Sequence, residues 1–268
     1  MNYYGEFGLE FNPFLKNSKE ILVKTCEYKE ITHRLEFLLQ SKGFGVITGL
    51  PGRGKTTIVR NWANSLNKNK YKIVYISLST ITVLEFYKQL ANELGLEYKY
   101  KKIENFKIIQ NEINRLVIEK KITPVIILDE ASYISSGILN DLKMLFNFEM
   151  DSKDRAIVLM VGLPQLNNTL RLTHHEPLRQ RIIVNYHIEE LNKDESKTYI
   201  ETKIKNAGGI PEDIIEANAM EAIINTGNGT PRIIDKICDN SLKITSMKKD
   251  KTITPEIVMM AVDEMELG

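Results

Sequence analysis

The stretch from Gly49 to Thr56 carries residues suited to chemistry, because it reads G-x-x-x-x-G-K-T, the spacing of a phosphate-binding loop. Its glycines allow the backbone to curl until several N–H groups converge on phosphate oxygens. Lys55 then reaches the β- and γ-phosphates, and the Thr56 hydroxyl takes one position around Mg²⁺. A plain Gly/Pro turn would need neither side chain, so the stretch predicts binding of ATP and Mg²⁺. The expected cofactor-binding residues here are Gly49, Pro51, Gly52, Arg53, Gly54, Lys55, Thr56 and Thr57.

A second pair of candidate residues, Asp129 and Glu130, follows the apolar run 125–128. A strand there would deliver Asp129 to the carboxyl edge of a sheet, where it binds cofactor by holding Mg²⁺ through water. Glu130 is placed to polarise the attacking water as a general base. An isolated Asp-Glu pair is more often a solvated strand end. Its place downstream of a phosphate loop, with strands and helices between, favours hydrolysis of ATP to ADP and phosphate.

The elements that must position these residues follow from the hydrophobic pattern. Apolar runs at 44–48, 71–76, 125–128, 156–161 and 182–188 predict strands, and they alternate with amphipathic stretches that predict helices. This alternation is typical of a doubly wound, parallel sheet, so we expect an α/β fold with five strands. The predicted helices of this part span 27–40, 57–66, 82–94, 105–119 and 137–148.

The pattern changes after residue 188, where the remaining periodic segments are all helical. We therefore expect three parts. These are an extended N-terminal strap at 1–22 packed on the main domain, a P-loop domain at 23–190, and a smaller all-helical domain at 191–268. Helices of the last part are predicted at 193–206, 217–225, 231–247 and 255–265.

Composition narrows the class of protein. With 268 residues, 43% hydrophobic and 26% charged, the chain reads as an ordinary soluble protein, and its net charge of +1 means that any nucleic-acid binding needs a local patch. Cys26 and Cys238 are far apart and suit a reducing cytosol. No run approaches the roughly 20 apolar residues of a membrane span, so we expect a cytoplasmic protein without a membrane partner. His174-His175 lacks further His or Cys at ligand spacing and predicts a surface loop.

The Asp129-Glu130 pair, the strand at 156–161 and the helical tail together resemble the AAA+ ATPases. The chain is more closely similar to one branch of them, the transposition helper ATPases (TnsC-, TniB- and MuB-like) and the secretion-associated ExeA-type ATPases. The resemblance covers nearly the whole chain and implies a helical lid domain and ATP-dependent self-assembly into a ring or helical filament. The residues that carry it are Phe7-Gly8-Leu9, Pro13-Phe14, Gly49 to Thr57, Leu128 to Ala131, Val161 to Leu166, Leu178 to Ile182 and Gly229 to Ile234.

The resemblance gives roles to three arginines. Arg179 or Arg181 would project into the nucleotide site of the neighbouring subunit as a catalytic residue, with Arg181 preferred because it lies nearer the strand. A surface arginine pair is the alternative. Arg232 would bind the cofactor ATP from the lid of its own subunit. A cation near a helix start is disfavoured by the helix dipole, and a phosphate would compensate.

One departure from the family concerns the end of the strand at 156–161. AAA+ proteins usually place a polar residue there, whereas this chain reads Val161-Gly162-Leu163-Pro164, with no polar side chain before Gln165. Either Gln165 substitutes or this sensor is missing. We therefore expect slow hydrolysis that assembly stimulates.

The densest basic stretch consists of Lys99, Lys101 and Lys102, interleaved with Tyr98 and Tyr100. Lysines neutralise phosphates, and tyrosines donate hydrogen bonds to them. A solvated loop is the bland alternative. The resemblance supports a role in binding double-stranded DNA, because the family lines a ring pore with residues from this region.

Three functions remain open at this point. The leading prediction is a DNA-binding helper ATPase that assembles on target DNA and recruits or activates a transposase. The alternative is an ExeA-type ATPase of envelope secretion. Those proteins continue into a membrane span and a periplasmic portion, neither of which precedes Gly268, and we take this to favour DNA. A STAND-type signalling switch would need appended sensor domains.

Overall fold

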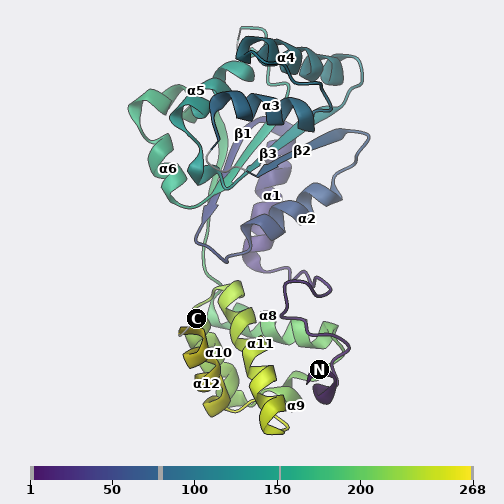
Figure 1. Cartoon of the computed structure of the whole chain (residues 1–268), viewed down its shortest axis with the longest axis vertical. Coiled ribbons are helices and arrows are strands. Elements are labelled where there is room, and N and C mark those ends of the chain that lie inside the picture. The colour runs from purple at the N-terminus through teal and green to yellow at the C-terminus, as the bar shows by residue number, and fades with distance from the viewer. Residues whose placement is uncertain (1–2, 78–80, 151, 267–268) are drawn as a thin grey trace. The chain divides into compact units, whose positions relative to one another are not determined.

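The computed structural model describes residues 3–77, 81–150 and 152–266, and the chain divides into two compact units (Figure 1). The sheet unit comprises residues 30–51 and 55–188. The helical unit comprises, among the described residues, 3–29, 52–54 and 189–266. Residues 1–2 of the predicted strap and 267–268 of the predicted lid domain lie outside the described residues. The helical unit resumes at Glu189, against a predicted boundary at residue 191.

Within the described residues, five strands form one parallel sheet in the order β2-β3-β4-β1-β5, which confirms the predicted fold class. Every residue of β1 and β4 is buried, as expected for strands covered on both faces. Parallel strands end at one edge of a sheet. There Thr48 aligns with Gly162 and His187, and Ser77 aligns with Asp129. The strands are β1 (Gly43–Gly49), β2 (Tyr71–Ser77), β3 (Thr123–Asp129), β4 (Ile157–Gly162) and β5 (Ile182–Ile188).

Helices cover both faces of the sheet. On one face, α3 (Val83–Glu93), α4 (Lys102–Ile118) and α5 (Ser136–Leu145) bury a core with alternate residues of the strands. The other face is covered by α1 (Cys26–Ser41) and by α2 (Lys55–Ser65), which follows the phosphate loop (Figure 1). α1 approaches β1 so closely that a Cβ on Gly45 would lie 2.5 Å from Leu38 Cδ2. The glycine therefore permits this packing.

Local signals set the helix ends. Thr82 and Glu85 form a reciprocal capping box at the start of α3, and Asn192 and Glu195 do the same for α8 (Lys193–Asn206). The sequence did not predict the short elements of the sheet unit, because one or two turns show no hydrophobic period. These are η2 (Ala131–Tyr133), α6 (Gln165–Leu170), η3 (Thr173–His175) and α7 (Glu176–Arg179).

The helical unit confirms the four helices predicted after residue 188 and adds the single turn α9. Its core draws on all the long helices and on the N-terminal segment. The elements are η1 (Tyr3–Phe7), α8 (Lys193–Asn206), α9 (Pro211–Ile214), α10 (Ala217–Gly227), α11 (Pro231–Lys248) and α12 (Pro255–Glu266).

The N-terminal segment corrects one expectation. It was predicted to pack on the main domain, but Phe7 and Phe14 are buried in the core of the helical unit. Polar contacts fix it there, because the Tyr3 hydroxyl and the Asn12 amide both donate to Asp239 Oδ1, at 2.8 and 2.7 Å. The aromatic composition indicated burial correctly, but it could not indicate in which core.

Candidate nucleotide site

The phosphate loop connects β1 to α2. Gly52 and Gly54 have φ angles of +82° and +85°, the left-handed conformation that glycine adopts without strain. Lys55 is the first residue of α2, and its Nζ donates to Gly49 O at 2.8 Å and to Leu50 O at 2.9 Å. The side chain therefore folds back over the first residues of the loop. This is the placement expected of a cation that meets bound phosphates.

Asp129 lies at the centre of the candidate magnesium site. Its carboxylate is 5% exposed and accepts hydrogen bonds from three separate groups. Thr56 Oγ1 and Tyr75 Oη both donate to Oδ2 at 3.0 Å, and Glu130 N donates to Oδ1 at 2.9 Å. The predicted meeting of Thr56 with Asp129 at the carboxyl edge of the sheet is thus observed.

These oxygens fit Mg²⁺. Mg²⁺ prefers hard oxygen ligands and is usually held by one or two carboxylates together with substrate phosphates and waters. A hydroxyl and a carboxylate lie side by side beside a loop built for phosphates. Among the described residues, no group of three or more His, Cys, Asp and Glu side chains could hold a metal on its own. A metal at Asp129 would therefore depend on the nucleotide for further ligands.

Glu130 occupies a sharp turn between β3 and η2. Its backbone is left-handed, with φ +56° and ψ +33°, which is uncommon for a residue with a side chain. Such conformations cost about 1 kcal/mol or more and cluster at functional sites. The turn redirects the chain immediately after Asp129 and leaves Glu130 exposed. An exposed carboxylate next to the metal ligand is what a base acting on water requires.

Tyr75 is a site residue that the sequence analysis missed. It lies on β2, two residues before Ser77, which aligns with Asp129. Burial, followed by the Asp129 charge and the hydrogen bond to it, raises the pKa of Tyr75 to about 12, so its hydroxyl is a donor at neutral pH. Only the register between neighbouring strands reveals this contact.

The end of β4 is where the sequence lacks the polar sensor residue expected of the family. Gly162 is required there, since a Cβ would lie 2.6 Å from Ser132 Oγ. Gln165 begins α6 and is exposed. Asn167, one half-turn on, donates from Nδ2 to Thr48 Oγ1 at 3.1 Å, and this hydroxyl is also 3.1 Å from His187 Nδ1. Asn167, which the sequence analysis did not single out, therefore brings a polar group to the end of β1.

The two candidate arginines differ sharply. Arg181 has a side chain only 13% exposed and is fixed within its own unit. It donates to Lys143 O at 3.1 Å, to Phe146 O at 3.0 Å and to Asp154 at 2.8 Å, and it lies 5.0 Å from the centre of the Phe44 ring. These contacts weigh against the preference for Arg181 as the residue acting in a neighbouring subunit, which stays a prediction. Arg179, whose side chain is 43% exposed, fits that role better.

The basic stretch is partly neutralised. Lys102 Nζ pairs with both oxygens of the buried Asp141, at 2.8 and 2.6 Å, and Lys99 Nζ lies 3.2 Å from Glu97. Lys101 precedes α4 and is exposed. The Lys102 ion pair indicates a structural role, while DNA binding by Lys99 and Lys101 stays a prediction.

The loop that carries these lysines is held on its buried side by Asn105, which is fully buried. Its side chain accepts from Lys99 N at 2.8 Å and donates to Lys99 O at 2.8 Å and to Lys101 O at 3.1 Å. The exposed Tyr98 and Tyr100 lie on the same loop, with Lys88 Nζ within 6.0 Å of each ring centre. One buried amide thus shapes a surface loop of aromatic and basic residues.

Four predicted cofactor-binding residues fall within the helical unit, namely Gly52, Arg53, Gly54 and Arg232, and the two arginines bring charged side chains. Arg53 has a side chain 8% exposed that pairs with Glu189 and Glu190, so its charge is compensated. Arg232 is the second residue of α11 and is exposed, and its N–H donates to Gly52 O at 3.3 Å. Contact of Arg232 with ATP stays a prediction.

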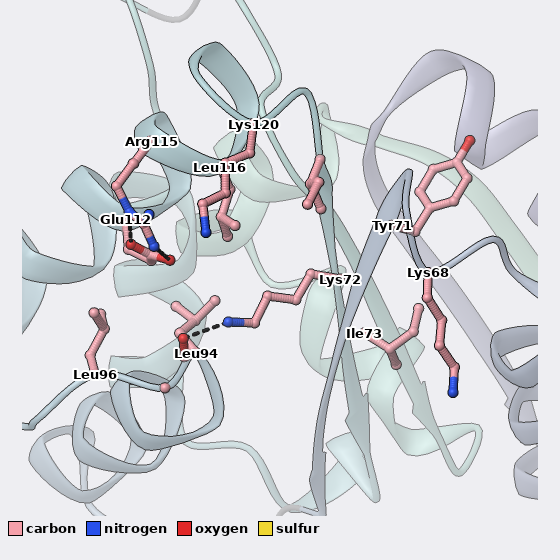
Figure 2. A pocket seen from close by; sticks show the side chains of 12 residues that line it. Lys68, Tyr71, Lys72, Ile73, Leu94, Leu96, Glu112, Arg115, Leu116 and Lys120 are labelled. Atoms are coloured by element: carbon pink, nitrogen blue, oxygen red, sulfur yellow. Dashed lines mark hydrogen bonds and ion pairs between the residues drawn. The ribbon is translucent and has the colours of Figure 1, made fainter.

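A cavity of about 600 Å³ lies elsewhere in the sheet unit (Figure 2). It sits at the amino ends of β2 and β3, at the opposite end of these strands from Asp129. Lys72 Nζ donates to Leu94 O at 2.6 Å across it, and Arg115 pairs with Glu112 at its rim. None of the predicted site residues lines this cavity. The candidate nucleotide site therefore consists of the phosphate loop and the residues at the carboxyl ends of the strands.

Comparison with known protein families identifies the class of domain to which residues 38–170 belong. Residues 38–170 match the family model described as an AAA domain. Together with the parallel sheet and the contact of Thr56 with Asp129, this match identifies an AAA+ ATPase domain with a P-loop fold. Among the described residues, no helix has both the length and the apolar character needed to cross a bilayer.

The chain is also similar to one curated protein, General secretion pathway protein A of Aeromonas hydrophila. The two are 29% identical over 243 residues, which is 88% of this chain and 43% of that protein. The chain therefore spans less than half the length of this relative.

Solved structures share the fold. Cdc6p from Pyrobaculum aerophilum matches with a TM-score of 0.71 and 19% identity, covering 94% of this chain and 70% of that chain. Drosophila ORC bound to DNA matches with a TM-score of 0.70 and 18% identity, covering 97% and 66%. The RuvB Holliday junction branch migration motor of Thermotoga maritima gives 0.59 and 19%, covering 88% and 67%. At these identities the likeness establishes the fold.

Proposed function

We propose that this chain is an ExeA-type ATPase of envelope secretion, in which ATP binding drives self-assembly and hydrolysis reverses it. The observation that carries this proposal is the similarity to General secretion pathway protein A over 88% of the chain. That similarity supports the secretion alternative rather than the transposition function that the sequence analysis favoured. The absence of a membrane span before Gly268 no longer discriminates, because the chain matches only 43% of the relative.

The chemistry assigns a step to each side chain. Lys55 and the loop N–H groups bind the phosphates of ATP, while Thr56 and Asp129 would hold Mg²⁺, which supplies charge neutralisation to phosphoryl transfer. Glu130 accepts the proton of the attacking water. Arg179 of a neighbouring subunit stabilises the charge on the transferred phosphoryl group, so hydrolysis becomes fast only after assembly.

A second candidate is the DNA-dependent helper of a transposase. The observation that favours it is the exposed loop with Tyr98, Lys99, Tyr100 and Lys101, since aromatic rings and lysines together suit a phosphate backbone and its bases. The pairing of Lys102 with Asp141 weakens it. Assembly would multiply the few contacts of each subunit along one duplex.

A chimera separates the two candidates. Residues 1–268 of this chain replace the matching region of General secretion pathway protein A in Aeromonas hydrophila cells that lack it, and the extracellular fraction of a secreted enzyme is measured. We expect the chimera to restore secretion and the same chimera with Lys55→Ala to fail. In parallel, anisotropy of a labelled duplex is followed across a salt series with a non-hydrolysable ATP analogue. Failure of the chimera together with ATP-dependent duplex binding would move the DNA candidate ahead.

A further inference from the structure

The hydroxyl of Tyr75 reaches Asp129 from an edge strand of the sheet. Among the described strands β2 borders β3 alone, and Tyr75 lies on it close to the carboxyl edge where Asp129 ends β3. Its side chain is not core packing, because the residue remains 46% exposed while its neighbours Val74 and Ile76 are fully buried. A half-exposed tyrosine whose hydroxyl contacts a buried carboxylate suggests that the tyrosine acts on the carboxylate and not on the packing of the core.

The hydrogen-bond acceptor positions of Asp129 indicate how Tyr75 acts on this carboxylate. An ionised carboxylate offers about four lone-pair directions. Thr56 and Tyr75 use those of Oδ2, and Glu130 N uses one of Oδ1. The donors come from α2, from β2 and from the turn after β3, so the plane of the carboxylate is fixed from three sides. One direction on Oδ1 is left to accept from a further donor.

We propose that Tyr75 is a positioning residue for the nucleotide-bound metal, which orients Asp129 so that Oδ1 is presented to Mg²⁺ and its waters. This inference rests on the proposed ATP site. Tyr75 does not contact the metal or the phosphates itself. It holds the carboxylate in one orientation, and the binding of Mg²⁺ then needs no reordering of that side chain.

The test removes one oxygen atom. Tyr75→Phe keeps the ring and deletes the donor, and Tyr71→Phe is the matched control, since it removes the same atom at the other end of the same strand, beside the cavity (Figure 2). Binding of a fluorescent ATP analogue is measured in EDTA and across a Mg²⁺ titration. We expect unchanged binding in EDTA and a Mg²⁺ midpoint at least about tenfold higher for Tyr75→Phe, as the loss of one hydrogen bond to a carboxylate predicts. Tyr71→Phe should match wild type.

Turnover gives an independent readout. Tyr75→Phe should lose ATPase activity at limiting Mg²⁺ and recover it at saturating Mg²⁺. General damage to the fold would instead lower the activity at both Mg²⁺ concentrations. Thermal unfolding without nucleotide checks the fold. A Mg²⁺ midpoint equal to wild type would overturn the inference. A lower midpoint would overturn it too, by showing that the hydroxyl competes with the metal. If wild type itself shows no Mg²⁺-dependent binding, the proposed ATP site fails instead.

Discussion

Arg179 and Arg181 provide the sharpest test of the structure, because the sequence favoured Arg181 as the arginine acting in a neighbouring subunit, whereas the contacts favour Arg179. We expect Arg181→Ala to destabilise the protein and Arg179→Ala to leave its stability unchanged while abolishing assembly-stimulated hydrolysis. The reason is that Arg181 is embedded in the sheet unit, whereas the side chain of Arg179 is 43% exposed.

The magnitude follows from the contacts that each side chain makes. Arg181 donates to two main-chain carbonyls around the end of α5, and each bond contributes about 1 kcal/mol. The ion pair with the partly exposed Asp154 adds about 0.5 kcal/mol, and the contact with the Phe44 ring adds about 0.5 to 1 kcal/mol. The free energy of unfolding should therefore fall by about 3 kcal/mol. Arg179 donates to Arg171 O at 3.0 Å and lies 4.0 Å from Glu176, but both contacts are exposed to solvent, so for Arg179→Ala we expect a change of only about 0.5 kcal/mol.

Urea unfolding at equilibrium measures the stabilities, and phosphate release measures hydrolysis at several protein concentrations. Arg181→Lys is a useful intermediate, since it keeps the charge and loses the planar fork that reaches several acceptors at once. Mixing Arg179→Ala with Lys55→Ala should restore part of the activity, because one subunit then supplies the arginine and the other the intact nucleotide site. Equal stability of wild type and Arg181→Ala would refute this reasoning, as would recovery on mixing by Arg181→Ala but not by Arg179→Ala.

Three further predictions concern the nucleotide site and the sheet unit. Lys55→Ala should abolish binding of a labelled ATP analogue, while Lys68→Ala, an exposed lysine beyond the same helix, should bind like wild type; equal affinities would refute the site. Glu130→Gln should bind ATP with unchanged affinity and hydrolyse it at least about a hundredfold more slowly, because an amide accepts no proton from water, and wild-type phosphate release would exclude the base role. His175 was expected in a surface loop but is buried in η3, and burial, followed by the charge of His174, lowers its pKa below 6.5. The unfolded state then binds the proton more readily, so the contribution of His175 to stability is complete above pH 6.5 and is lost as the pH falls through its lower folded pKa. His175→Gln should flatten the decline of the urea midpoint below pH 6.5 relative to wild type and to His174→Gln, and parallel declines would count against this assignment.

Much of the fold could be predicted from the sequence because each strand is a compact apolar run between helices long enough to show a period. The same reasoning missed α6, α7 and α9, which are too short to display one. It also placed the N-terminal segment on the wrong core, because Phe7 and Phe14 signal burial without naming a partner.

The site was predictable where residues follow one another in the chain and unpredictable where they meet across it. Lys55 and Thr56 belong to one motif, and Asp129 follows the apolar run that predicts a strand of the same sheet. The contact between Thr56 and Asp129 was therefore expected. Tyr75 depends on the register of two strands, and Asn167 depends on a helix that turns back toward β1. Neither arrangement leaves a mark on the local sequence.

The buried amide of Asn105 has a consequence for the evolution of the loop before α4. Its hydrogen bonds go to the main chain at residues 99 and 101, so the shape of the loop is set from inside and depends little on the exposed side chains. Tyr98, Lys99, Tyr100 and Lys101 can therefore be exchanged without refolding the loop, much as recognition loops vary on a constant framework. A partner that binds there meets a surface already ordered, and the entropic cost of association is correspondingly small.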